Sequence, residues 1–154
     1  MGVELSGIGI GREAATGQVL KFVRDPAVDE HRRSAQAPES EREALRGAIE
    51  SQVASTRSQA TESDDETAAI LEALVMILED DELLTMAQSH LESGWDGATA
   101  LFLALDDLAE MMGDDEDFLS RVGDLRGMAR GISAALRGLI ATAAIPTEGS
   151  WVVV

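Results

Sequence analysis

The most informative segment of the sequence is ILEALVMILEDDEL, which spans residues 70–83. At 100° per residue, a helix here carries a core group of apolar residues on one side and a second stripe beside it. That apolar arc is wider than one core face requires. Two interpretations stay open: a helix buried by neighbours on two sides, or a helix whose stripe is an exposed docking surface, with the acids at the helix end steering the partner. The core group comprises Ile70, Leu71, Leu74, Ile77 and Leu78, and the stripe comprises Ala69, Ala73, Met76 and Asp80.

Capping signals place this segment in a series of helices. Ser40-x-x-Glu43 and Ser63-x-x-Glu66 have capping-box spacing, so we expect one helix to open at Ser40 and a second to open at Ser63 and run through Leu78. The first of these helices carries one apolar face, formed by Leu45, Ile49 and Val53.

Three further helices are expected in the rest of the chain. A break around Asp80 and Asp81 would start a third helix that Gly94 closes, and Asp96 would cap a fourth that Gly113 closes. The fourth helix would turn Leu101, Ala104, Leu105, Leu108 and Met112 inward. The last helix has one continuous apolar stripe made of Phe118, Val122, Leu125, Ala129, Ile132, Leu136 and Leu139.

The two ends of the chain are typical of extended structure. Residues 7–22 contain two short apolar runs that predict strands, residues 24–38 predict an irregular connection, and Trp151 to Val154 predict a further strand. An apolar strand needs neighbours, so we expect the chain to have been cut inside a larger domain. The predicted fold is therefore mainly α: an antiparallel bundle of four to five helices (residues 39–140), inserted into a partial, truncated α/β domain (residues 1–23 and 141–154).

Charge narrows the classes of partner. The 154 residues include 29 Asp and Glu against 12 Lys and Arg, which gives a formal charge of −17. Residues 58–120 hold eighteen acids and no Lys or Arg. Nucleic acid and anionic membranes would repel this field, so a basic protein surface is the expected partner. The sequence has no cysteine, so we expect no disulfides. It has no signal-peptide pattern and no apolar stretch of 18 residues, so we expect no membrane insertion.

Nothing in the sequence forms a complete active site. Gly7-x-Gly9-x-Gly11 lacks the third glycine of a dinucleotide loop. The Asp106-Asp107-x-x-Glu110 cluster favours solvated helix surface, although a metal-dependent enzyme that uses it stays open as a rival hypothesis. The acids at 114–117 do not fit the pattern of a calcium-binding loop. We expect them to neutralise the amino-terminal dipole of the last helix. His31 is expected to be solvated, and His90 is expected to cap or pack. We therefore predict no catalytic and no metal-binding residues.

Three segments resemble one known family. Residues 70–83 are similar to a Phe-Glu-Ala/Gly-His-x-Met-Leu-Leu-x-Asp-x-Glu-Leu motif, and Arg121-x-x-Asp124-Leu125-Arg126 is similar to its Arg-x-x-Asp-Val-Arg run. Gly7-Ile8-Gly9-Ile10, followed by Ala15-x-Gly17-x-Val19, looks like its first two strands. Together they resemble the amino-terminal region of Enzyme I, the phosphoenolpyruvate-protein phosphotransferase of the bacterial sugar phosphotransferase system. The sequence departs from the family at Leu5-Ser6-Gly7, Leu74, Gly127 and Gly131.

The resemblance implies a helical bundle that binds the small carrier protein HPr, inserted into a phosphohistidine swivelling domain. It implies a cytoplasmic, magnesium-dependent parent enzyme that dimerises through its phosphoenolpyruvate-binding domain. The phosphoacceptor histidine would follow Val154, so this chain would hold no cofactor and no catalytic residue. An acidic interaction bundle without any role in phosphotransfer is the alternative. By resemblance, the carrier-facing residues are Glu66, Ala69, Ala73, Met76, Ile77, Asp80, Glu82, Leu83 and Arg121.

Overall fold

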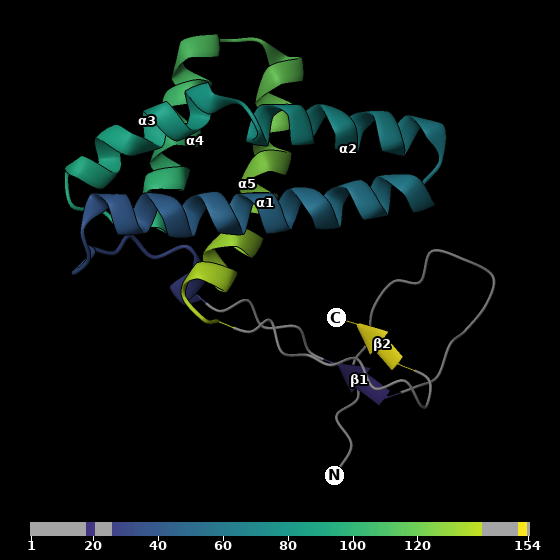
Figure 1. Cartoon of the computed structure of the whole chain (residues 1–154). Coiled ribbons are helices and arrows are strands. Elements are labelled where there is room, and N and C mark those ends of the chain that lie inside the picture. The colour runs from purple at the N-terminus through teal and green to yellow at the C-terminus, as the bar shows by residue number, and fades with distance from the viewer. Residues whose placement is uncertain (1–17, 21–25, 140–150, 154) are drawn as a thin grey trace. The chain divides into compact units, whose positions relative to one another are not determined.

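The computed structural model describes residues 18–20, 26–139 and 151–153. The chain divides into two units, one made of residues 1–24 and 142–154 and the other of residues 25–141. The larger unit contains a 3₁₀ turn, η1 (Pro26–Val28), and five helices, α1 (Pro38–Glu62), α2 (Asp65–Leu78), α3 (Asp81–Glu92), α4 (Gly97–Met112) and α5 (Glu116–Leu136). Figure 1 shows α1 and α2 as one antiparallel pair, and α4 and α5 as another. The predicted helical bundle is confirmed.

Aspartates cap four of the five helices. Asp64, Asp80, Asp96 and Asp115 each accept a hydrogen bond from a backbone N–H in the first turn of the helix that follows. Each cap satisfies an amide that has no partner within the helix, and each carboxylate faces the positive end of the helix dipole. The predicted roles of Asp80 and Asp96 are confirmed, and so are the closures by Gly94 and Gly113, whose φ angles are +92° and +63°.

The two predicted capping boxes are wrong in position. Helix α1 begins at Pro38, two residues before Ser40, and its N-cap Ala37 makes no side-chain cap bond. Proline is pre-organised for the first helical turn and keeps the residue before it extended, so the helix starts there. Ser63 ends α1, and the neighbouring Asp64 caps α2 by accepting a 2.8 Å bond from the Thr67 amide.

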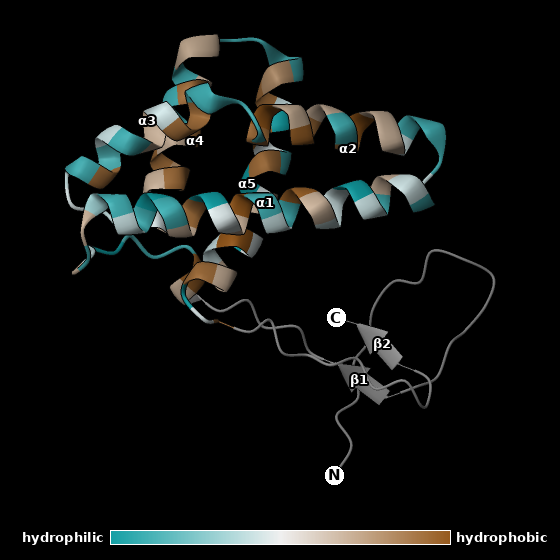
Figure 2. Cartoon of the chain, in the orientation of Figure 1, coloured by the Kyte–Doolittle hydropathy of each residue, from teal (hydrophilic) through white to brown (hydrophobic). Residues whose placement is uncertain are grey.

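The core lies where the helices meet. Figure 2 shows apolar residues, in brown, along α4 and α5, and the buried residues of these helices include Leu101, Leu105, Leu125 and Ile132. The stripe predicted for the last helix is confirmed, since Val122, Leu125, Ala129 and Ile132 are all buried. Two assignments are wrong, because Ile70 of α2 is 51% exposed and Met112 at the end of α4 is 44% exposed. On α2 the buried positions are Leu74, Val75 and Leu78, so the core face lies farther round the helix than the sequence predicted.

The smaller unit contains two described strands, β1 (Gln18–Leu20) and β2 (Trp151–Val153). They pair in parallel, with Val19 opposite Val152. This pairing confirms that an early and a late strand share one sheet, with the helices between them in the sequence. The predicted strand at Gly7 to Gly11 lies outside the described residues.

The connection predicted to be irregular is in fact held against the helices. The backbone N–H of Arg32 donates to Thr99 Oγ1 over 2.9 Å, and the N–H of Ser34 donates to the carbonyl of Gly94 over 3.0 Å. Arg33 pairs with Trp95 in an isolated antiparallel bridge. These bonds are made by backbone groups. A pattern of apolar and polar side chains therefore does not reveal them.

Candidate functional site

The predicted stripe of α2 lies on the surface of the bundle. Met76 is 71% exposed, Ala69 is exposed and Ala73 is half-buried. Glu66 is exposed in the first turn of the same helix. Side chains three and four residues apart share a helix face, so Ala69, Ala73 and Met76 form one continuous strip. We call these three residues the α2 strip. The short side chains of its two alanines project little from the helix, whereas Met76 projects into solvent at the carboxyl-terminal end of the strip.

Acidic side chains continue this surface around the corner between α2 and α3. Asp80 and Glu82 are exposed there, and the Asp80 carboxylate accepts a 2.9 Å bond from the Glu82 amide. Glu79 is held by Arg57 of α1 through two bonds of 2.9 and 2.8 Å. Among the described residues, no arginine, lysine or histidine lies within ion-pair distance of Asp80, Asp81 or Glu82. The corner therefore presents three unpaired carboxylates beside the α2 strip.

Two residues predicted to contact a partner are placed differently. Leu83 is only 2% exposed, because it begins the core stripe of α3 that continues through Ala87 and Leu91. Ile77 is half-buried and packs against the core. Leu83 therefore supports the surface from beneath, while a partner contact at the half-buried Ile77 stays a prediction. Arg121 is exposed on α5, which packs against α2.

Sequence reasoning also missed exposed apolar residues near the turn between α4 and α5. Met111 is 65% exposed and Leu119 is 42% exposed. Leu119 directly follows Phe118, which the helical period places on the apolar stripe, so its exposure could have been identified from that phase. Met111 lies three residues from Leu108, so the period gives no such signal for it.

The acids proposed as a metal cluster do not converge. Asp106 pairs with Arg126 of α5, while Asp107 Oδ2 lies 2.6 Å from His90 Nε2 of α3. Neither pairing was predicted, because the partners lie on other helices. No group of three His, Asp or Glu side chains that could hold a metal ion occurs in the described part of the chain. His90 packs half-buried, and His31 lies edge-on to Trp95 with ring centroids 5.9 Å apart.

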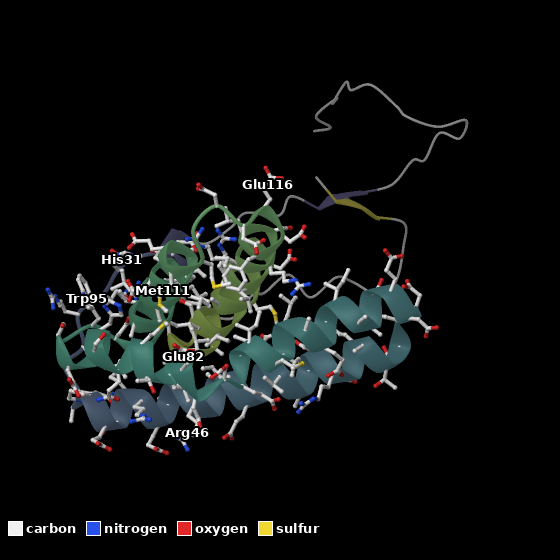
Figure 3. The ribbon with its side chains drawn as sticks, turned by 90° about the horizontal axis from the view of Figure 1, so that it is seen from above. His31, Arg46, Glu82, Trp95, Met111 and Glu116 are labelled. Carbon is white, nitrogen blue, oxygen red and sulfur yellow. The ribbon has the colours of Figure 1, made fainter. Side chains whose placement is uncertain are left out.

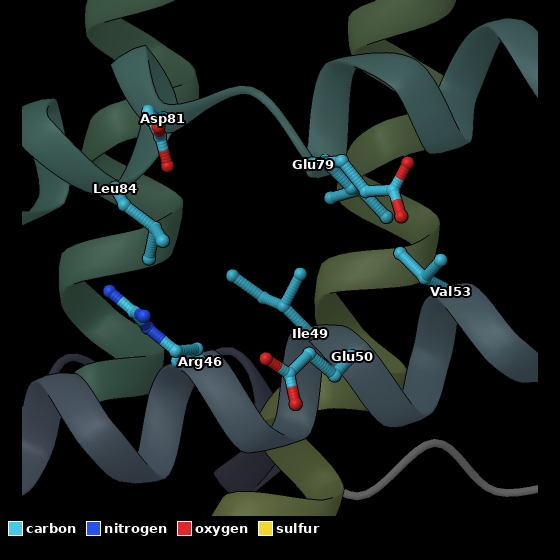
Figure 4. A pocket seen from close by; sticks show the side chains of 8 residues that line it. Arg46, Ile49, Glu50, Val53, Glu79, Asp81 and Leu84 are labelled. Atoms are coloured by element: carbon cyan, nitrogen blue, oxygen red, sulfur yellow. The ribbon is translucent and has the colours of Figure 1, made fainter.

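A pocket of about 380 Å³ lies between α1 and the α2–α3 corner. Figure 4 shows Arg46 and Ile49 of α1 on one side, and Leu84 and Asp81 on the other. Its lining residues are carboxylates, aliphatic side chains and one arginine, without a serine, threonine or histidine. It therefore offers no hydroxyl nucleophile and no imidazole base, and we assign it no chemistry.

The comparisons with known proteins identify the family. The family described as "PEP-utilising enzyme, N-terminal" matches residues 6–121. The chain belongs to this family. The search of the curated proteins found no match for the chain. Its fold is also that of a solved structure described as the N-terminal domain of Enzyme 1 - Nitrogen, with a TM-score of 0.69 and 22% sequence identity.

The structural match covers 88% of this chain and 58% of the solved one, so the chain spans a little over half the length of that relative. At this level of identity the likeness establishes the fold. In the described part of the chain, no helix is both long and apolar enough to cross a membrane.

Proposed function

We propose that the helical unit docks an HPr-type phosphocarrier for a phosphoenolpyruvate-dependent phosphotransferase of the Enzyme I kind. The observation that carries the proposal is the 71% exposure of Met76 beside an unpaired acidic corner. The α2 strip was marked independently by its helical period and by resemblance to the carrier-facing positions of Enzyme I. It combines an apolar anchor with a charged surround, which is typical of a protein-binding surface.

Charge would bring the carrier to this surface. Asp80, Asp81 and Glu82 lie in an eighteen-acid region that lacks Lys and Arg, and no described cation neutralises them. A carrier with positive charge around its active histidine, which the resemblance implies, would be steered toward the corner. Met76 would then slow dissociation, because apolar contacts are not screened by salt.

The catalytic contribution of such a docking unit is positional. Phosphoryl transfer between two imidazole nitrogens requires the attacking and leaving atoms to be in line, and holding both reactants in place removes much of the barrier. The phosphoacceptor histidine, the magnesium site and the dimer contact would belong to other parts of the parent enzyme. Within this chain, His90 pairs with Asp107, and His31 lies against Trp95. We assign neither histidine a catalytic role.

The test is titration calorimetry of HPr into this chain and three single variants. Met76→Asp should weaken binding about thirtyfold, the loss of an interface anchor worth about 2 kcal/mol. Ala54→Asp adds the same charge at an exposed position of α1 and should leave the affinity within about twofold, since rim charges contribute little. Arg121→Gln should weaken binding by less than Met76→Asp.

Two results would contradict the proposal. If the unmutated chain does not bind HPr, the docking function fails, and an acidic interaction bundle that serves another basic protein becomes the better interpretation. If HPr binds the Met76→Asp and Ala54→Asp variants equally well, the docking surface lies elsewhere on the chain.

A further inference from the structure

One side chain ties together the start and the end of the helical unit. Arg137, directly after α5, is only 4% exposed. Its guanidinium donates to the carbonyls of Ala27 and Val28, over 2.7 and 3.2 Å, and to the hydroxyl of Thr99 over 3.1 Å. It also forms two 3.2 Å bonds with the carboxylate of Asp96, the N-cap of α4. Every guanidinium nitrogen therefore has a partner, and those partners come from two separate segments of the chain.

Residues 26–34, which we call the strap, lie along this end of the unit. Besides the bonds to Arg137, the carbonyl of Val28 accepts a 2.8 Å bond from the buried hydroxyl of Ser133. Farther along, the carbonyl of Arg32 accepts from the Asp96 amide over 2.9 Å. Arg33 stacks over Trp95, with its guanidinium carbon 3.9 Å from the ring centroid, and Figure 3 shows Trp95 beside His31 of the strap.

The attachment of the strap is almost entirely polar. Among residues 27–34, whose burial is described, Val28 alone belongs to the buried apolar residues. The polar groups that the strap contacts are Thr99, Ser133, Asp96 and Arg137, all of which water can satisfy, and the one aromatic ring that it contacts in the described part of the chain is that of Trp95. Opening the strap would therefore exchange hydrogen bonds with the protein for hydrogen bonds with water, and would expose little apolar surface. The helical core contains no strap residue, so it would keep its contacts.

We propose that the strap is a releasable element latched by Arg137, and that it opens while the helices stay folded. The helical unit begins at residue 25, so the strap is its first segment. Local openings of this kind are drawn from the parts of a protein with few apolar contacts.

Native-state hydrogen exchange on the whole chain tests the proposal. The strap reporters are the amides of Arg32, Ser34 and Asp96, which bond across the strap, and the core reporters are the amides of Leu101 and Leu105 in α4. In the unmutated protein, exchange at the strap reporters should depend less on denaturant than exchange at the core reporters. Arg137→Met, which keeps the aliphatic stem and removes the donors, should speed exchange at the strap at least tenfold and exchange at the core much less.

Arg130→Met is the matched control. Arg130 lies on α5 and also bonds to the strap, through Asp29, but that pair is exposed, so exchange at the strap should change by less than about threefold. The proposal is overturned if strap and core amides of the unmutated protein show the same denaturant dependence, because the strap would then open only with global unfolding. It is also overturned if Arg137→Met speeds both sets equally.

Discussion

The α2–α3 corner and the base of the helical unit use the same residue types in opposite ways. At the corner, Asp80 and Glu82 stay in solvent without a cation beside an exposed methionine. At the base, Asp96 and Arg137 are 17% and 4% exposed and satisfy each other. A buried charge is tolerated only when it is paired and hydrogen-bonded, whereas an exposed unpaired charge costs little and acts at a distance. The paired charges therefore organise the fold, and the unpaired ones are available to a partner.

The comparison also explains why one acidic chain needs both arrangements. A formal charge of −17 opposes compaction through self-repulsion. Four capping aspartates each face the positive end of a helix, and five acids pair with arginines. Asp96 belongs to both sets, so eight different acids in the described part of the chain are used locally, and Asp81 and Glu82 of the corner are among the acids that are not.

The largest expected effect separates the two faces of α2. Leu78 is 1% exposed and Met76 is 71% exposed, although they are only two positions apart. Leu78→Asp would bury a charge without a partner and should destabilise the chain by about 4 kcal/mol or more, whereas Met76→Asp should change stability by less than about 1 kcal/mol. Urea denaturation followed by circular dichroism measures both. Equal losses would mean that the α2 strip is part of the core, and the contrast between core and docking face would disappear.

The second effect concerns the unpaired charges of the corner. The HPr on-rate should fall about tenfold between 50 mM and 500 mM salt, since screening lengths shrink from well above 10 Å toward a few Å. The dissociation rate should change less. Replacing Asp80 and Glu82 by Asn and Gln should flatten the salt dependence, and Asn can still cap α3. Stopped-flow kinetics measures these rates, and an on-rate indifferent to salt in the unmutated chain would remove the steering role of the corner.

Much of the bundle could be predicted because its signals are local. The stripe from Val122 to Ile132, the aspartate caps and the glycine closures all depend on residues within a few positions of one another. Ile70 was misassigned for a physical reason. An arc wider than one face leaves the rotation of a helix to its neighbours, and here α2 packs against α1 and α5 with Val75 buried in the core.

The contacts between distant segments could not be predicted in this way. The partners of Arg137 are 38 to 110 residues away in sequence, and those of His90 and Arg126 are 17 and 20 residues away. Patterns in a window of a few residues carry no information about such pairs. The period of one helix identifies the residues of the α2 strip as sharing a face, but whether that face is exposed depends on the neighbouring helices.

A third, smaller effect tests the paired charges by pH. Burial acts to raise the pKa of Asp96, but the bonds from Arg137 and Thr99 outweigh it and hold the pKa below the ordinary 3.8. A carboxyl whose folded pKa is lowered stabilises the protein above its unfolded pKa, and that contribution is lost as pH falls through the folded value. The stability difference between the unmutated protein and Asp96→Asn should be on the order of 1 kcal/mol at pH 7 and should shrink below about pH 4. Denaturation curves at pH 7, 4 and 3 measure it, and a constant difference would contradict the charged latch.

The smallest effect concerns the one acid at the corner that is paired. Arg57 bonds to both oxygens of Glu79, but the two side chains are 49% and 43% exposed. Exposed pairs contribute about 0.2–1 kcal/mol, so Arg57→Gln should destabilise the chain by no more than that. The same change frees one more carboxylate beside Asp80, and should therefore raise the HPr on-rate slightly at low salt and leave it unchanged at high salt. A double-mutant cycle with Glu79→Gln isolates the pair, because that second change removes the freed charge as well. If Arg57→Gln slows association, Arg57 itself faces the carrier, and the boundary of the docking surface has to move from α2 onto α1.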